Sequence, residues 1–290
     1  MNLHPLHPAT SVLDQLAATG WQIIDLLAFT RSSTLILASR DYDEPVVIKA
    51  GFGSNHVLAE MDEKDRPAAY GFYWYQQMTP AERGLAREDF RHERELVRDC
   101  LGAARVVPLI DEGECAEFDW YTMPHYPDGN LCPLTAGNST PAGLGQILTI
   151  LADVADGLDS LHRRGIVHRD LYQENVLLNN GRGVITDLGA ARRTDEPRGP
   201  RNRGPEVHWP PEYAHSFAEA TPSADVYSLA VLAYRILFAD LPRIDGPRHH
   251  HGLPATVTDH IIAALASNPD ARPTMTELRT NLREAATTTP

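Results

Sequence analysis

Apolar and polar residues in the first half of the chain follow the period of strands, interrupted by one helix. Three short segments combine apolar and β-branched residues between turn-forming residues, which predicts an antiparallel meander; they are 21–29, 33–39 and 45–50. Apolar residues spaced three and four apart then predict a helix over 88–101. The apolar run 105–110 predicts a further strand, and another is expected to end near 120–123.

The second half of the chain follows the period of helices. Apolar residues recur every three or four positions over 144–161, which predicts a long, largely buried helix. Further helices are predicted over 221–239, 256–267 and 274–284. The last of them begins with the Thr-x-x-Glu capping signal at 274–277.

Together these patterns predict an α+β chain with two lobes. A small lobe built on an antiparallel sheet is expected at 21–124, with an insertion at 52–87. A larger, mainly α-helical lobe is expected at 125–285. An N-terminal extension, 1–20, and a tail, 286–290, complete the predicted division.

Composition restricts the class of partner. The 290 residues are 42% hydrophobic and 22% charged, as in an ordinary globular protein. The formal net charge of −13 opposes attraction to nucleic acid and anionic lipid, so we expect no nucleic acid and no membrane partner. No apolar run approaches the ~20 residues of a membrane span. The cysteines form no paired motif, which favours a reducing compartment, and we expect a cytoplasmic protein.

Two motifs in the second half indicate the chemistry. Residues 167–178 read VHRDLYQENVLL, and residues 184–191 read VITDLGAA. The first segment resembles the H-R-D-L-x-x-x-N catalytic loop of eukaryotic-like protein kinases of the Ser/Thr type, and Asp187-Leu188-Gly189 resembles their D-F-G triplet. The resemblance implies a bilobal protein-kinase-like fold, with a C helix on the small sheet lobe and a larger helical lobe.

The same resemblance implies roles for the residues of these motifs. Asp170 is expected to orient the acceptor hydroxyl, and His168 and Arg169 belong to the same catalytic motif. Asn175 and Asp187 are expected to hold Mg²⁺ against the phosphates of ATP, because magnesium favours hard oxygen ligands.

A lysine that binds phosphates has two available positions, since Lys49 and Lys64 are the only lysines. Lys49 lies in PVVIKA, which resembles the V-A-I-K strand of the family, so the resemblance implies that Lys49 contacts the ATP phosphates and pairs with a helix glutamate. Glu93 is the expected partner, because the apolar residues after it match the family's C helix. Glu95 lies about 200° around the helix and is the weaker candidate.

The resemblance also implies that adenine binds at a hinge formed by Met123, Pro124 and Tyr126. Pro124 lacks an N–H group but keeps its carbonyl, so it can accept a hydrogen bond, while the N–H of Tyr126 can donate one. A plain connection between the lobes is the alternative for this segment.

Three charged residues of the second half resemble scaffold residues of the family. The resemblance implies that Asp225 holds the backbone of the catalytic loop. It also implies a paired charge between Glu212 and Arg272 in the helical lobe, where loss of one partner is costly.

The sequence departs from the family pattern at two places. Ala28, Thr30 and Ser33 occupy the positions of the three glycines in the nucleotide-covering loop, which is expected to stiffen or lift that loop and to weaken nucleotide binding. Tyr172 and Pro205 occupy the positions of the lysine and threonine that usually accompany the catalytic aspartate. The acceptor side is therefore expected to differ or to be compensated by arginine.

The sequence also leaves open whether phosphorylation activates the protein. Arg169 precedes the catalytic aspartate, as in kinases whose activation loop is ordered by phosphorylation. Thr194 is the one hydroxyl residue between Asp187 and Glu212, and we expect a minor phosphosite or none there, because Asp195 and Glu196 already supply negative charge.

The sequence therefore predicts an ATP-dependent, Mg²⁺-requiring kinase that transfers the γ-phosphoryl group to a hydroxyl side chain of a protein or peptide, with serine or threonine favoured. Two alternatives stay open at this point. The missing glycines suggest a pseudokinase scaffold, and Tyr172 and Pro205 suggest phosphorylation of a small molecule such as an antibiotic or metabolite. The aromatic cluster at 70–75 leaves a homodimer or a docked peptide open, although packing over the small lobe is its commoner use.

Overall fold

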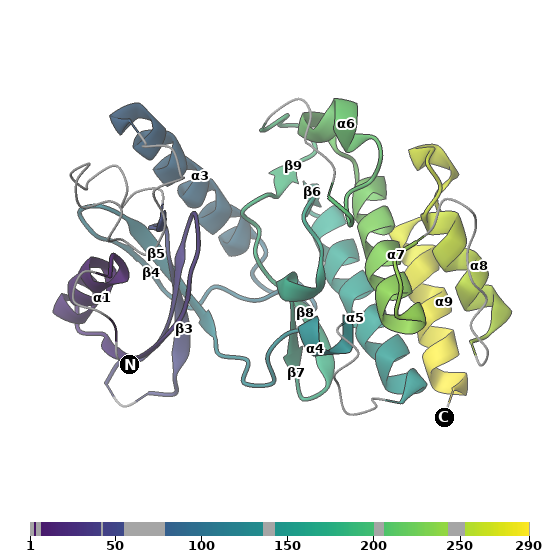
Figure 1. The fold of residues 1–290 in the computed structure, drawn as a ribbon, viewed down its shortest axis with the longest axis horizontal. Coiled ribbons are helices and arrows are strands. Elements are labelled where there is room, and N and C mark those ends of the chain that lie inside the picture. Colours follow the sequence, from purple (N-terminus) through teal and green to yellow (C-terminus); the bar gives the residue numbers. More distant parts are fainter. Residues whose placement is uncertain are drawn as a thin grey trace. The chain divides into compact units, whose positions relative to one another are not determined.

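A computed structural model describes most of the chain, and the chain divides into two compact units (Figure 1). The first unit comprises Met1–Leu101 and Pro108–His125, and the second comprises Gly102–Val107 and Tyr126–Pro290. The residues that the structure describes are 3, 7–41, 43–54, 79–135, 143–199, 206–242 and 253–289.

A five-stranded sheet organises the first unit. Neighbouring strands are antiparallel throughout, and the order along the sheet is β1-β2-β3-β5-β4. The predicted meander of three strands and the strand ending near 120–123 are therefore confirmed. The strands are β1 (Gln22–Phe29), β2 (Thr34–Ser39), β3 (Val46–Ala50), β4 (Glu112–Glu114) and β5 (Asp119–Pro124).

A short helix, α1 (Ala9–Ala18), lies within the predicted N-terminal extension and was not expected from the sequence. Its buried face, formed by Val12, Leu13 and Leu16, belongs to the same core cluster as Trp21 and Trp120. The helix has no side-chain cap at its N-terminus, so the usual sequence signal for a helix start is missing. The helix is stabilised by packing on the sheet core, which a local pattern does not reveal.

The helix α3 (Pro80–Asp99) begins earlier than the predicted start at 88 and ends two residues before 101. A reciprocal capping box between Thr79 and Glu82 fixes its N-terminus, with Pro80 at the first helical position. Most of the predicted insertion, including the aromatic cluster at 70–75, lies outside the described residues.

The strand predicted over 105–110 is wrong. Val106 forms an isolated parallel bridge with Ile185, and the N–H of Val107 donates to the Ile185 carbonyl at 2.9 Å. Pro108 follows and has no N–H group, so it cannot continue a hydrogen-bonded ladder. The strand of this region is instead the short β4, which starts at Glu112.

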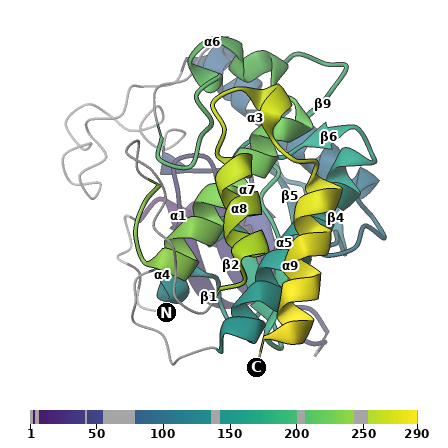
Figure 2. The ribbon, with the colours of Figure 1, turned by 90° about the vertical axis from the view of Figure 1, so that its right-hand side faces the viewer.

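The second unit is mainly helical, as predicted, and its helices α5, α7 and α9 pack against one another (Figure 2). The long helix α5 packs against α9 and α7, and α8 lies against both of those helices. A predicted capping box, Thr274 with Glu277, starts α9, which continues four residues beyond the predicted end at 284. The helices are α4 (Cys132–Thr135), α5 (Leu144–His162), α6 (Tyr213–Ser216), α7 (Pro222–Phe238), α8 (Ala255–Ala264) and α9 (Met275–Thr288).

Two small sheets in the second unit carry the loops of the candidate site. The strands β6 (Ile166–Val167) and β9 (Arg192–Arg193) pair with each other, and β7 (Val176–Asn179) pairs with β8 (Arg182–Ile185). Both pairs are antiparallel. Within the described part of the chain, none of the helices is apolar over enough length to pass through a membrane.

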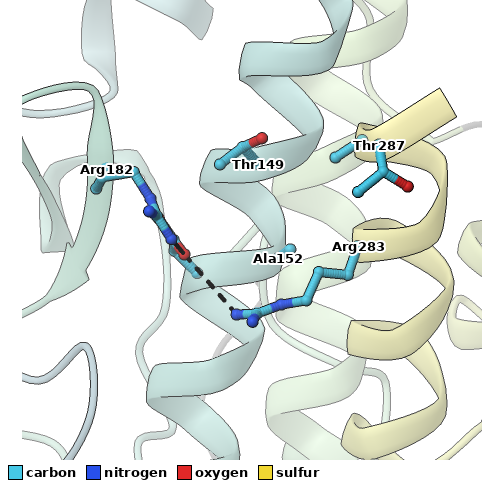
Figure 3. A pocket seen from close by; sticks show the side chains of 7 residues that line it. Thr149, Ala152, Arg182, Arg283 and Thr287 are labelled. Atoms are coloured by element: carbon cyan, nitrogen blue, oxygen red, sulfur yellow. Dashed lines mark hydrogen bonds and ion pairs between the residues drawn. The ribbon is translucent and has the colours of Figure 1, made fainter. Parts of the chain in front are cut away.

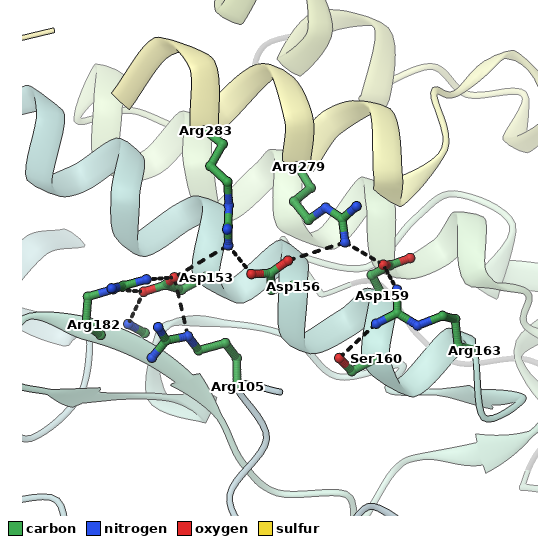
Figure 4. A network of polar contacts seen from close by, with 10 residues as sticks. Arg105, Asp153, Asp156, Asp159, Ser160, Arg163, Arg182, Arg279 and Arg283 are labelled. Atoms are coloured by element: carbon green, nitrogen blue, oxygen red, sulfur yellow. Dashed lines mark hydrogen bonds and ion pairs between the residues drawn. The ribbon is translucent and has the colours of Figure 1, made fainter. Parts of the chain in front are cut away.

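A network of charged side chains joins α5 to α9 and to β8 (Figure 4). Asp153 of α5 is 1% exposed and receives two hydrogen bonds of 2.6 Å from Arg182, while Arg105 lies 3.4 Å away. Arg279 and Arg283 extend from α9 to the aspartates of α5. The buried carboxylate is thus neutralised by several arginines, as a charge inside a protein requires.

A pocket of about 200 Å³ opens beside this network (Figure 3). Its charged groups, Asp153, Arg182 and Arg283, are already paired with one another, so we attribute the pocket to the packing of α5 and α9. The residues that line it are Thr149, Ala152, Asp153, Arg182, Arg283, Ala286 and Thr287.

Candidate active site

The first unit holds Lys49 and Glu93 together as a buried ion pair. The ammonium Nζ of Lys49 lies 2.6 Å from Oε1 of Glu93, and the two residues are 6% and 4% exposed. Tyr121, the cross-strand neighbour of Lys49, donates its hydroxyl to the same Oε1 at 2.8 Å. Glu95 is exposed, so the structure places Glu93 and not Glu95 beside the lysine.

Aromatic packing fixes the position of Glu93 on α3. Phe90, one turn earlier on the helix, stacks on the ring of Tyr121 with centroids 5.7 Å apart. The strand β3 orients Lys49 and β5 orients Tyr121, so both partners of the glutamate come from the sheet. Sequence reasoning missed Tyr121, although the pairing of β3 with β5 places it opposite Lys49.

The turn between β1 and β2 is closed by the side chain of Thr30. The Thr30 hydroxyl accepts hydrogen bonds from the N–H groups of Ser32 and Ser33, at 3.3 and 3.1 Å, and donates to the Ser33 carbonyl at 3.0 Å. A hydroxyl that binds nearby backbone groups stiffens a turn, as the absence of glycines predicts. The loop N–H groups that glycine residues would leave to a phosphate are thus bound internally.

Gly53, in the segment after β3, is required by this turn. A Cβ atom at Gly53 would lie 2.4 Å from the carbonyl oxygen of Arg31, which is closer than real contacts allow. The next residue, Ser54, donates its N–H to the carbonyl of Thr30 at 2.9 Å. The glycine therefore supports the turn by allowing close packing of two backbones.

In the second unit, Asp225 anchors the catalytic loop, as predicted. Its carboxylate accepts the N–H groups of His168 and Arg169 at 2.8 and 2.9 Å. His162 of α5 lies 2.8 Å from the same carboxylate. Complete burial raises the pKa of Asp225, but the hydrogen bond from His162 and the loop N–H groups outweigh it and hold the pKa below its ordinary value.

The anchored backbone is strained at Arg169. Its φ of 69° lies in the left-handed region, which costs energy for a residue with a side chain. The two hydrogen bonds that the Asp225 carboxylate accepts hold two consecutive peptides of the loop, those that contribute the N–H groups of His168 and Arg169. We conclude that Asp225 maintains the loop geometry that presents the next residue, Asp170.

Asp170 is held through one of its two carboxylate oxygens. Oδ1 accepts hydrogen bonds from His208 Nε2 at 3.0 Å and from Trp209 Nε1 at 3.1 Å. Among the described residues, none donates to Oδ2, and the side chain is 29% exposed. Partial burial raises the pKa of Asp170, but the hydrogen bonds from His208 and Trp209 hold it below its ordinary value, so the carboxylate is ionised at neutral pH.

Asn175 and Asp187 are brought together by their backbones. The Thr186 N–H donates to the Asn175 carbonyl at 3.0 Å. This contact places Asp187, the next residue along the chain, near Asn175. The amide Nδ2 of Asn175 donates to the Asp170 carbonyl at 2.9 Å, which leaves the amide oxygen for another partner. Oδ1 of Asp187 accepts the Gly189 N–H at 3.1 Å.

The chemistry of these two side chains fits a divalent metal ion that keeps water and phosphate oxygens among its ligands. A carboxylate and an amide oxygen are hard ligands, and two protein ligands suffice for such a shared site. The structure shows no group of three or more histidine, cysteine, aspartate or glutamate side chains arranged to bind a metal among the residues it describes.

His168 is fully buried and links the two loops. Its Nε2 lies 3.0 Å from the Thr186 carbonyl, and its Nδ1 accepts the Asp170 N–H at 3.3 Å. The side chain thus ties the segment before Asp187 to Asp170. A part for His168 in catalysis stays a prediction.

The guanidinium of Arg169 is engaged by main-chain carbonyls. It donates to Ala190 at 2.6 Å, to Arg198 at 2.8 Å and to Phe217 at 3.2 Å. It also lies over the ring of Phe217, 4.3 Å from the centroid. These contacts hold residues 190 and 198 of the segment after Asp187. Phosphorylation of Thr194 stays a question for experiment.

Glu212 and Arg272 form the predicted pair. The guanidinium donates to both carboxylate oxygens, at 2.7 and 2.8 Å, and Arg272 is 8% exposed. This fork-shaped contact fixes both partners. Glu212 thereby holds the end of the segment that carries His208 and Trp209.

The hinge residues lie on both sides of the boundary between the two units. Met123 and Pro124 end β5, opposite Val47 and Val46 of β3. Tyr126 begins the longer part of the second unit, and burial raises the pKa of its hydroxyl. Their contact with adenine stays a prediction.

Sequence reasoning missed four residues that hold the predicted ones. His162 lies 63 positions from Asp225, and His208 lies 38 positions from Asp170. Tyr121 and Trp209 likewise act across long separations in the chain. Their contacts depend on tertiary packing, and a spacing pattern in one sequence carries no signal for them.

Comparison with known proteins identifies a family with a similar sequence. Residues 75–281 match the protein kinase domain family. The match covers more than half of the chain and includes α3, the catalytic loop, α4 to α8 and the first part of α9.

Three relatives illustrate the similarity. Serine/threonine-protein kinase PkaB of Streptomyces coelicolor is 34% identical over 163 residues, which are 47% of this chain and 39% of the relative. Serine/threonine-protein kinase Pkn1 of Myxococcus xanthus is 34% identical over 183 residues, 57% of this chain and 25% of the relative. Serine/threonine-protein kinase pkn2 of the same organism is 32% identical over 207 residues, 67% of this chain and 24% of the relative. The chain thus matches less than half the length of each.

Proposed function

Because the chain belongs to the protein kinase family, we propose that it transfers the γ-phosphoryl group of ATP to serine or threonine hydroxyls of a protein or peptide. The observation that carries the proposal is the Asp170 carboxylate, which is partly exposed and, among the residues that the structure describes, is held through one oxygen. The hydrogen bonds also hold its pKa below the ordinary value. A carboxylate held in this way can accept a hydrogen bond from an acceptor hydroxyl through its second oxygen. The names of the three relatives support serine or threonine as the acceptor.

The family uses ATP and a divalent metal, and we propose magnesium as the metal. Asn175 and Asp187 would hold the ion, which supplies positive charge to the phosphate oxygens when bound. Lys49, oriented by Glu93 and Tyr121, would bind the phosphates directly. Met123, Pro124 and Tyr126 would contact adenine.

Three further features belong to the same proposal. The two lobes would span 21–124 and 125–285. The protein would act in the cytoplasm, with a protein or peptide as its partner. The net charge of −13 supports a partner other than nucleic acid.

The proposal is tested by calorimetric titration of the protein with ATP and Mg²⁺, followed by transfer of a labelled γ-phosphate to a library of serine, threonine and tyrosine peptides. Binding together with transfer to serine or threonine peptides is the expected result. Binding without transfer to any peptide or protein would contradict the proposal, and the same assay with hydroxylated metabolites would then identify a small-molecule acceptor.

We expect Lys49→Arg to weaken ATP binding by about 10-fold or more. The variant keeps the positive charge beside Glu93, but a planar guanidinium cannot occupy the position of the compact ammonium, so a charged hydrogen bond to phosphate is lost. Calorimetry with ATP and Mg²⁺ measures the change in Kd. Lys64→Arg, the same substitution at the other lysine, is the matched control, and an equal effect of the two variants would contradict the role of Lys49.

We expect Thr30→Ala to strengthen ATP binding by about 2-fold to 10-fold. The change removes the hydroxyl that binds the N–H groups of Ser32 and Ser33, which then become available to a phosphate. Ser32→Ala serves as the control, because it removes a neighbouring exposed hydroxyl. A Kd that is unchanged or higher in Thr30→Ala would show that the loop N–H groups do not meet the nucleotide.

A further inference from the structure

His208 and Trp209 form a clamp on one oxygen of Asp170. Both donors come from the segment that precedes α6, and both reach Oδ1, at 3.0 and 3.1 Å. The segment is distant in sequence from the catalytic loop, by 38 and 39 positions. Two donors on a single carboxylate oxygen define the rotation of the carboxylate, because they fix the direction in which the other oxygen points.

The imidazole of His208 is itself fixed by its surroundings. The ring of Tyr172, from the catalytic loop, stacks on it with centroids 5.0 Å apart and an interplanar angle of 25°. The hydroxyl of Ser228, on α7, donates to the His208 carbonyl at 2.8 Å. The ring of Trp209 meets it edge to face at 5.7 Å. Because these contacts restrict His208, its imidazole N–H can hold the Asp170 carboxylate in one orientation.

Tyr172 takes part as a neutral aromatic ring. Burial, together with the nearby Glu174, Asp170 and Asp187, raises the pKa of its hydroxyl well above the ordinary value. Tyr172 thus occupies the position where the family pattern has a lysine, and it contributes a stacking surface for His208 instead of a cation. The donor beside Asp170 that a lysine side chain would otherwise supply is found here on the imidazole of His208.

We propose that His208 is a positioning residue for phosphoryl transfer, which holds Oδ1 of Asp170 through its Nε2–H group so that Oδ2 meets the acceptor hydroxyl. This inference rests on the proposed kinase function. In this inference, the stacked side chains of Tyr172 and His208 take the place of the lysine and threonine that usually accompany the catalytic aspartate in the family. His208 acts through Asp170 and does not itself touch the transferred group.

The test compares His208→Gln with His208→Met. The two replacements are similar in size and both lose the aromatic ring, but only glutamine keeps an N–H donor near the position of Nε2. We expect His208→Met to lower kcat by about 10-fold to 100-fold, as loss of a hydrogen bond to a charged group implies, with the KM for ATP unchanged within about 2-fold. We expect His208→Gln to stay within about 3-fold of the wild-type kcat.

His215→Met is the matched control, because His215 is an exposed histidine of α6 in the same region, and its kcat is expected to equal that of the wild type. Thermal unfolding of all three variants checks that each is folded at the assay temperature. Equal kcat values for the glutamine and methionine variants, at the wild-type level or below it, would overturn the role of the N–H donor. A wild-type protein that binds ATP and transfers no phosphate would instead refute the proposed function, and the inference with it.

Discussion

Asp170→Asn is expected to slow phosphoryl transfer by about 10²-fold to 10⁴-fold while leaving ATP binding nearly unchanged. Asparagine has almost the same shape, and its amide oxygen can still accept the hydrogen bonds of His208 and Trp209. The second position of the carboxylate becomes an NH₂ group, which cannot accept a proton or a hydrogen bond from the acceptor hydroxyl. Single-turnover transfer of a labelled γ-phosphate measures the rate, and calorimetry measures the ATP Kd.

Asp14→Asn gives the matched control, because it makes the same chemical change at an exposed position of α1. Turnover of Asp170→Asn at the wild-type rate would remove Asp170 from the mechanism. A variant that loses ATP binding together with transfer would indicate a structural role for Asp170. The expected combination, intact binding with slow transfer, separates orientation of the acceptor from binding of the nucleotide.

The sequence predicted best those elements whose signals are local. The period of α5 extends over 19 residues, and the cap of α9 consists of two residues three positions apart, so both were located closely. The cap of α3 was equally visible in the sequence, as Thr79 and Glu82, but the apolar residues with helical spacing begin only at Phe90, further along the helix. The helix α1 has no such signal, and its packing against the sheet decides its formation.

The residues of the candidate site divide in the same way, into those with a local sequence signal and those whose contacts depend on tertiary packing. Lys49, Asp170, Asn175 and Asp187 are predicted from short motifs that resemble those of the family, so their signals are local. The groups that orient them come from elsewhere in the chain. Tyr121 reaches Glu93 over 28 positions, and only the register of β3 against β5 reveals it.

The second large effect is expected from Asp225→Asn, which should lower the free energy of unfolding by about 3–5 kcal/mol. The carboxylate is completely buried and accepts hydrogen bonds from the backbone of His168 and Arg169, with His162 beside it. An amide of the same shape must turn its NH₂ group toward one of these donors, which leaves buried donors without an acceptor. Urea unfolding followed by circular dichroism measures the change.

The pH dependence of stability provides a second measure of the same group. Asp225 has its pKa below the ordinary value in the folded protein, so its contribution to stability is complete above the pKa of the unfolded chain and is lost as the pH falls through the lower, folded value. The asparagine variant lacks this titration. Its unfolding free energy should therefore approach that of the wild type as the solution is made acidic.

Asp259→Asn, at an exposed position of α8, is the control for the chemical change and is expected to alter the unfolding free energy by less than about 0.5 kcal/mol. If Asp225→Asn is as stable as this control, the carboxylate does not hold the loop in the way the hydrogen bonds indicate. If it is destabilised and the remaining folded protein also transfers phosphate more slowly, the left-handed backbone at Arg169 needs the anchor to persist. The Asp225 carboxylate, which does not contact the substrate, would then maintain the loop that presents Asp170. Substitution of Asp225 would lower both stability and catalysis, whereas substitution of Asp170 would lower catalysis alone.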